Sequence, residues 1–187
     1  AAKRLMQEAG YGPNKRLEVV AVIASGGGGQ MVPLPMNEMM QENIKEIWID
    51  VKFEVVDFTT IINMLRGGTR SEQQRGFHAL NIAIPSIDPT TGWVIYDSTL
   101  TAPRGVNWGW YNNPAVDAQI KVMREAFDPA AQTAAMGQLH TLLVDDAAAL
   151  FVVHDLNPRG LSPRVKGFTQ VRNWFQDYTP VTVGPAS

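Results

Sequence analysis

The sequence predicts an α/β fold, in which helices flank a mixed sheet. Residues 17–24 are rich in Val and Ile, which is typical of a strand. Residues 50–57 place apolar side chains at alternate positions, which predicts a second, half-buried strand. Between these segments, Met36, Met40 and Ile44 recur at helical spacing. Strands that alternate with helices in this way favour a layered fold with a partly parallel sheet.

Further elements extend this alternation in chain order. Residues 1–9 predict a short helix that ends at a glycine. Thr59 or Thr60 is suited to cap a helix that ends at Gly67-Gly68. Residues 77–84 form an apolar run that predicts a third strand.

Two capped helices and a strand are predicted later in the chain. Asn113-Pro114 and Asp128-Pro129 each place a good N-cap residue before a proline at the first helical position. Residues 150–153 are a short apolar run, which favours a buried strand over a helix. The predicted buried faces of the two helices carry Val116, Ile120, Met123 and Phe127, then Met136, Leu139 and Leu143.

Composition excludes several classes of protein. The 187 residues are enough for one domain with a sizeable core. Hydrophobic residues make up 45% and charged residues 18%, which is ordinary for a globular domain. A formal net charge of −2 argues against an electrostatic nucleic-acid binder. The absence of cysteine excludes disulfides, thiolate metal sites and cysteine catalysis.

No catalytic or cofactor motif is present. The four glycines at 26–29 lack the Lys and Ser/Thr of a phosphate-binding loop, so we interpret them as a mobile loop. His78, His140 and His154 match no zinc spacing, and we interpret the last two as structural. We therefore predict no enzyme activity, metal or cofactor.

Several phrases of the sequence resemble one family in the same order. Residues 2–11 are similar to a family helix of the form AxxLLxEAGY, and residues 41–56 to its helix-to-strand passage. Residues 65–68 and 76–79 resemble its next glycine-containing step. This family is the peptide/nickel type of extracytoplasmic solute-binding protein, the ligand-capturing subunit of ABC importers. Trp48 stands where the family usually has glycine, which predicts a rebuilt turn, and His78 replaces an aspartate.

The resemblance implies the fold and the function. It implies that residues 1–187 form a single α/β domain, the C-terminal lobe of a type II clamshell that closes on a solute, with the N-terminal lobe absent. It also implies a periplasmic protein that captures a peptide or amino-acid-like compound and delivers it to the permease subunits of an ABC transporter.

The family's ligand loop follows the strand that residues 77–84 resemble. It commonly carries a tryptophan and, in peptide binders, an aspartate. Counting forward places these at Ile84 and Ile87, whereas counting back from Asp88 places them at Ile82 and Pro85. Asp88 is the nearby carboxylate that can accept from a peptide ammonium, or else a turn residue before proline.

The resemblance therefore directs the ligand-binding prediction to this loop and the aromatic segment after it. Aromatic side chains supply large contact area at small entropic cost, although some of them are expected to pack against the lobe instead. Arg104 and Asn107 are expected to orient a polar solute. The complete predicted set is Ile84, Ser86, Asp88, Trp93, Arg104, Asn107 and Trp108.

Two other functions stay open at this stage. A small hydrolase would assemble its site from Asp88 and His154, together with loop residues. A protein-interaction domain would instead use the exposed aromatic loop to dock a partner.

Overall fold

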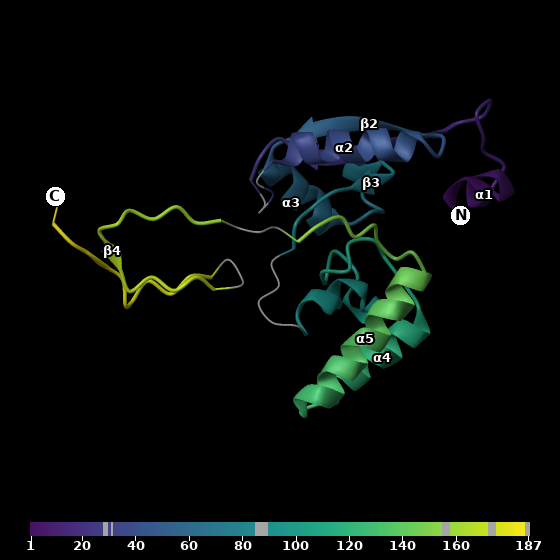
Figure 1. The fold of residues 1–187 in the computed structure, drawn as a ribbon. Helices are drawn as coiled ribbons and strands as arrows, with labels where there is room; N and C mark the ends of the chain where they lie inside the picture. Colours follow the sequence, from purple (N-terminus) through teal and green to yellow (C-terminus); the bar gives the residue numbers. More distant parts are fainter. Residues whose placement is uncertain (28–29, 31, 85–89, 155–157, 172–174, 186–187) are drawn as a thin grey trace.

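The computed structural model describes residues 1–27, 30, 32–84, 90–154, 158–171 and 175–185 (Figure 1). A sheet-and-helix layer, a helical hairpin and a two-stranded ribbon follow one another along the chain. The short helices are α1 (Ala2–Glu8), η1 (Glu72–Gln74), η2 (Gly92–Tyr96) and η3 (Ser98–Leu100).

The sheet is built from three parallel strands. β1 (Leu17–Ala24) lies in the centre, with β2 (Ile49–Val56) on one side and β3 (Ala79–Leu80) on the other. The connection from β1 to β2 contains α2 (Pro33–Lys45), and the connection from β2 to β3 contains α3 (Phe58–Gly67). The two connections run in opposite directions across the sheet, so right-handed crossovers place α2 and α3 on opposite faces.

Alternation along β1 distributes its side chains between these two helices. Val22 and Ala24 are buried in one cluster with Ile61, Met64 and Leu65 of α3. Ile23 points to the other face and is fully buried, which agrees with a parallel strand covered on both sides. The predicted strands at 17–24 and 50–57 are therefore confirmed.

Two predicted details of this layer are wrong. The cap of α3 is Asp57, whose Oδ1 accepts a hydrogen bond from the main-chain N–H of Thr60 at 3.0 Å. Asp57 is extended and lies directly before the first helical turn, whereas Thr59 and Thr60 are already inside the helix. The third strand is also shorter than residues 77–84, since the ladder pairs only Ala79 and Leu80 with β1.

The turn between α2 and β2 keeps a glycine-like backbone although Trp48 occupies it. Trp48 has a φ of 67°, in the left-handed region that glycine adopts without strain. Its main-chain N–H donates to Lys45, and its carbonyl oxygen accepts from Leu17 at the start of β1. These two bonds hold the turn in place, and its rebuilding relative to the family stays a prediction.

We expect Trp48→Gly to be more stable than Trp48→Ala by about 1 kcal/mol. Both changes remove the indole, but only alanine keeps a Cβ in the left-handed region. The difference between the urea unfolding midpoints measures this strain directly. Equal midpoints for the two variants would show that the turn relaxes and that the φ of 67° carries no cost.

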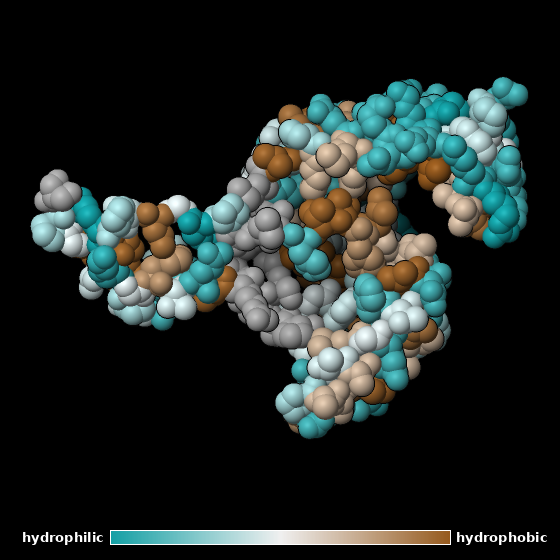
Figure 2. All heavy atoms as spheres, in the orientation of Figure 1, coloured by the Kyte–Doolittle hydropathy of each residue, from teal (hydrophilic) through white to brown (hydrophobic). Residues whose placement is uncertain are grey.

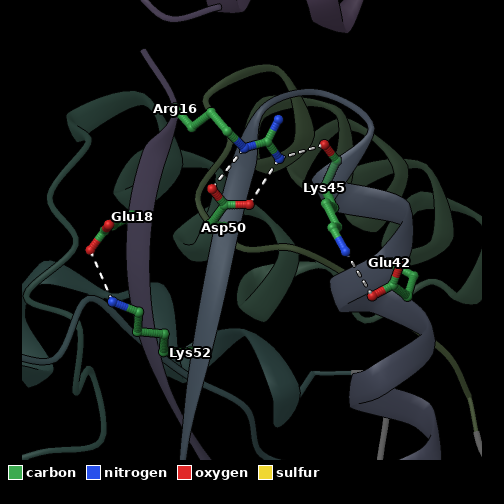
Figure 3. Close-up of polar contacts among 6 residues, drawn as sticks. All are labelled: Arg16, Glu18, Glu42, Lys45, Asp50 and Lys52. Atoms are coloured by element: carbon green, nitrogen blue, oxygen red, sulfur yellow. Dashed lines mark hydrogen bonds and ion pairs between the residues drawn. The ribbon is translucent and has the colours of Figure 1, made fainter. Parts of the chain in front are cut away.

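Charged side chains form hydrogen bonds and ion pairs between the end of α2 and the amino-terminal ends of β1 and β2 (Figure 3). The Arg16 guanidinium donates to both oxygens of Asp50, at 2.7 and 2.8 Å, and to the carbonyl oxygen of Lys45 at 2.9 Å. The hydrogen bond from Arg16 lowers the pKa of the Asp50 carboxyl. Glu18 and Lys52 form a second ion pair across the two strands, at 3.1 Å. These pairs lie at the edge of the sheet opposite to the carboxyl ends of the strands.

A helical hairpin forms a second hydrophobic cluster. α4 (Pro114–Glu125) and α5 (Pro129–Asp145) pack along each other, and η2 packs against α4. The predicted caps Asn113 and Asp128 are confirmed, since each side chain accepts a main-chain N–H at the helix start. Phe127 is wrong as a core residue, because α4 ends before it and its side chain is 94% exposed. The buried residues of this cluster are Tyr96, Val116, Ile120, Met123, Ala135, Leu139 and Leu143.

Asp146 connects the end of α5 to the start of α4. Its Oδ2 accepts hydrogen bonds from the Tyr111 hydroxyl at 2.5 Å and from Asn113 Nδ2 at 3.0 Å. These bonds lower the pKa of the Asp146 carboxyl. Burial and the bond to Asp146 raise the pKa of Tyr111 to about 12.

The Asp146 contacts predict a pH dependence with two limbs. A lowered carboxyl pKa stabilises the fold above the ordinary pKa of aspartate and is lost as pH falls through the lowered value. A raised tyrosine pKa stabilises the fold below the ordinary value of 10 and is lost as pH rises toward about 12. We expect Asp146→Asn to lower the thermal midpoint near neutral pH, and we expect its difference from wild type to shrink as pH falls below the ordinary pKa of aspartate. Thermal unfolding across this range measures it, and a constant difference would contradict it.

The segment after the hairpin is not the buried strand that its sequence predicts. Residues 150–153 are in no strand, and Leu150 and Val153 are 70% and 63% exposed. An apolar run becomes a strand only beside a partner, and no described strand lies next to this one. The chain then continues to a ribbon of β4 (Val165–Lys166) and β5 (Thr182–Val183), which projects away from the hairpin (Figure 1). No helix in the described ranges is long and apolar enough to cross a bilayer.

Candidate functional site

The order of the strands marks one edge of the sheet as a place for a ligand. In the strand order β2-β1-β3, the connection after β1 runs to one side and the connection after β2 runs back to the other, and ligands of such sheets bind at the carboxyl ends of the strands where the direction reverses. The chain leaves this end of β1 through a loop with several glycines, and it leaves β3 through residues 81–84.

A small hollow lies at this edge. Its empty volume of about 160 Å³ includes open solvent, so it is a shallow depression and not an enclosed pocket. The first turn of α3 closes it through Phe58 and Ile61. The lining residues are Ala24, Gly27, Gln30, Phe58, Ile61, Asn81, Ile82 and Ala83.

Three side-chain amides form a chain of hydrogen bonds behind this hollow. Gln30 Nε2 donates to Asn81 Oδ1 at 2.6 Å, and Asn81 Nδ2 donates to Asn37 Oδ1 at 2.9 Å. Asn37 Nδ2 donates to the carbonyl oxygen of Pro33 in the first turn of α2 at 2.7 Å, and its side chain is fully buried. We call the three side-chain amides together with the Pro33 carbonyl the amide chain. It connects the glycine loop, the end of β3 and the start of α2.

Figure 2 shows how apolar groups are distributed on this side of the molecule. Hydrophobic residues gather in the hollowed zone between the sheet layer and the α4–α5 hairpin. The hollow itself is lined by neutral side chains, whereas the Arg16–Asp50 pair lies at the far edge of the sheet. This hollow is suited to an uncharged part of a ligand.

One residue of the predicted ligand set lies next to the hollow. Ile84 directly follows the lining residues Ile82 and Ala83, and its side chain is 40% exposed. Ser86 and Asp88 lie outside the described residues. The role of these three positions in binding stays a prediction.

The other predicted site residues lie in different surroundings. Trp93 packs against the hairpin cluster, with its ring 6.4 Å from that of His140. Trp108 packs against the sheet cluster instead. Arg104 is exposed, and Asn107 is fully buried with its amide bonded to the backbone of Asp97 and Tyr111. The structure does not bring these four side chains together, so their shared role in binding stays a prediction.

Sequence reasoning missed the amide chain. Asn81 is a lone amide in the apolar run 77–84, and Gln30 follows the glycine run directly. A polar residue inside a strand-like run is a signal for a buried hydrogen bond. The partner is not visible from the sequence, since Gln30 and Asn81 are 51 positions apart.

Only one of the two residues named for the alternative hydrolase site is among the described residues. His154 is exposed, and its predicted partner Asp88 lies outside them. His140 is exposed, and its ring lies 6.4 Å from that of Trp93 and 5.7 Å from that of Phe151. Within the described ranges, no group of three His, Asp or Glu side chains is arranged to hold a metal ion.

Comparison with known proteins decides the fold. No family profile matches the chain. The periplasmic oligopeptide-binding protein OppA of Escherichia coli (strain K12) is 24% identical over 168 residues, which is 90% of this chain and 29% of OppA. The oligopeptide-binding protein AppA of Bacillus subtilis, solved with a nonapeptide, aligns with a TM-score of 0.73 and 17% identity over 98% of this chain and 37% of AppA. The chain has the fold of part of an oligopeptide-binding protein.

A further solved structure supports this conclusion. Clavulanic acid biosynthesis oligopeptide binding protein 2 aligns with a TM-score of 0.78 and 17% identity over 98% of this chain and 33% of that protein. The chain thus spans about a third of the length of these oligopeptide-binding proteins. The predicted α/β fold and the predicted resemblance to solute-binding proteins are confirmed.

Proposed function

We propose that this chain is the C-terminal lobe of a periplasmic peptide-binding protein and contributes one wall of the peptide site. The observation that carries the proposal is the alignment of nearly the whole chain with oligopeptide-binding proteins, in both sequence and fold. The hollow at the carboxyl edge of the sheet supports it, because open parallel sheets bind ligands at this edge.

In this proposal the chain binds and releases its solute without chemistry. The described hollow is too small to enclose a peptide, so the remaining contacts come from a second lobe that closes over it. The closed form then delivers the peptide to the permease subunits of an ABC transporter. Residues 1–187 alone would bind the peptide several orders of magnitude more weakly than the whole protein, because each 1.4 kcal/mol of lost contact is about tenfold in affinity.

Native mass spectrometry of the full-length protein tests this proposal. The protein is purified without denaturation from its own cells, and it is then exposed to a pool of synthetic tri- to pentapeptides. We expect adducts whose masses match peptides, either retained from the cell or taken from the pool. Retention of a compound without peptide bonds, together with no adduct from the pool, would overturn the proposal.

A further inference from the structure

The outer edge of β2 is an open strand edge. β2 pairs with β1 on one side, and no strand of the described residues pairs with its other side. The carbonyl oxygens of Trp48 and Val56, at the two ends of β2, accept hydrogen bonds from the two ends of β1. Since main-chain groups alternate in direction along a strand, those of Val51, Phe53 and Val55 point to the open side. The edge thus offers a row of main-chain donors and acceptors to another strand.

Charged side chains on this edge are complementary to those of a second copy. Lys52 and Glu54 are both exposed and flank Phe53, and side chains two positions apart point to the same face of a sheet. An antiparallel pair of β2 strands with a two-fold axis at Phe53 places Lys52 of each copy opposite Glu54 of the other. The same register sets Val51 opposite Val55, which is 46% exposed in the single chain. Opposite charges and apolar side chains that face each other across two strands stabilise the pair.

Neighbouring registers are less favourable. An axis at Lys52 or at Glu54 places that residue opposite its own copy, and like charges directly opposite each other are destabilising. An axis at Val51 places Lys52 opposite Asp50, whose two carboxylate oxygens already accept hydrogen bonds from Arg16. Charged residues on an edge strand usually discourage pairing with other chains. Here they favour one register with a second copy, because their order along β2 is self-complementary.

The contacts of this edge within the single chain are compatible with the pairing. Gln41 Nε2 of α2 donates to the Val51 carbonyl oxygen at 2.6 Å. A carbonyl oxygen has two lone pairs, so the same atom can also accept an N–H group of the second copy. Lys52 lies 3.1 Å from Glu18 of β1. Its ammonium group carries three donors, which allows it to contact Glu54 of the second copy as well.

We infer that two copies of this chain associate through antiparallel pairing of their β2 strands, with the two-fold axis at Phe53. The pairing joins the two three-stranded sheets into one continuous sheet. The open edge lies on the side of the sheet layer away from the α4–α5 hairpin (Figure 1), and no residue of β2 lines the hollow. The inference goes beyond the proposed function and is independent of it, since the paired residues take no part in the hollow.

Sedimentation equilibrium of the full-length protein tests this inference through charge reversal. Lys52→Glu sets two carboxylates opposite each other on both sides of the axis, and Glu54→Lys does the same with two ammonium groups. We expect each single reversal to weaken dimerisation about thirtyfold, because two attractive pairs become repulsive. The double variant with both reversals is again self-complementary, so it should dimerise about as tightly as the wild type.

Glu18→Gln is the matched control. It removes the ion pair with Lys52 inside one chain and leaves the charges of β2 unchanged. This variant should keep the wild-type dimer, and thermal unfolding of every variant shows that it is folded. The inference is overturned by a wild type that stays monomeric up to about 1 mM, or by a dimer that neither single reversal weakens. A folded double variant that does not dimerise overturns it as well.

Hydrogen exchange of the wild type supplies a second measurement that needs no variant. The amides of Val51, Phe53 and Val55 point to the open side in the single chain and are bonded in the dimer. Their exchange should therefore slow as the protein concentration rises. Exchange that is independent of concentration over the same range overturns the inference, also where a charge reversal unfolds the protein.

Discussion

Gly68→Ala is expected to destabilise the protein by about 3 kcal/mol. Gly68 ends α3 with φ 72° and ψ 172°, a region that is essentially restricted to glycine. A Cβ at this position would lie 2.8 Å from Ala102 Cβ and 3.0 Å from Trp110 Nε1. Ala102 is only 1% exposed, so it has little room to move. Backbone strain and overlap therefore add, and urea unfolding monitored by tryptophan fluorescence measures the loss.

Gly76→Ala is the matched control for this prediction. Gly76 also has a positive φ, of 86°, but a Cβ there would meet no atom within 4 Å. We expect it to cost about 1 kcal/mol, from backbone strain alone. Equal losses of stability in the two variants would show that a Cβ at position 68 causes no costly overlap with Ala102. In that case the contact between the sheet layer and residues 101–110 would be loose.

The contrast between Gly68 and the predicted helix ends shows what local sequence determines. The Asn113-Pro114 and Asp128-Pro129 pairs satisfy their helix starts with atoms two or three residues away, so the sequence alone predicts them correctly. Gly67-Gly68 also predicts a helix end correctly. The overlap that adds to the backbone strain at Gly68 comes from Ala102 and Trp110, which are remote in the sequence.

The wrong predictions concern features that depend on residues remote in the sequence. Residues 150–153 have the composition of a strand, but a strand requires a partner that no local pattern supplies. The candidate site depends on contacts at still longer range, such as the bond between Gln30 and Asn81. The resemblance to a family directed the prediction to the loop after residue 84 and not to these amides.

Asn107 is predicted from the sequence to orient a solute. In the structure, its side chain forms hydrogen bonds with the backbone of its own loop. Its amide donates to the carbonyl oxygens of Asp97 at 3.1 Å and Tyr111 at 2.8 Å, and it accepts from the Tyr111 N–H at 3.0 Å. Its main-chain N–H donates to Leu100, and its carbonyl oxygen accepts from Ala102. One side chain thus links both ends of the segment between η2 and α4, the segment that also supplies the Ala102 contact to Gly68.

Asn107→Ala is therefore expected to cost about 3 kcal/mol, near 1 kcal/mol for each of the three lost hydrogen bonds. Asn112→Ala is the control, since Asn112 is an exposed amide in the same segment and should change stability little. Urea midpoints of both variants, measured beside peptide affinity in the full-length protein, separate the two roles of Asn107. A structural role lowers the midpoint of Asn107→Ala and, at temperatures where the variant stays folded, leaves much of the affinity. An unchanged midpoint with lost affinity would instead establish Asn107 as a ligand-binding residue, because only a contact with the peptide separates the two measurements in that direction.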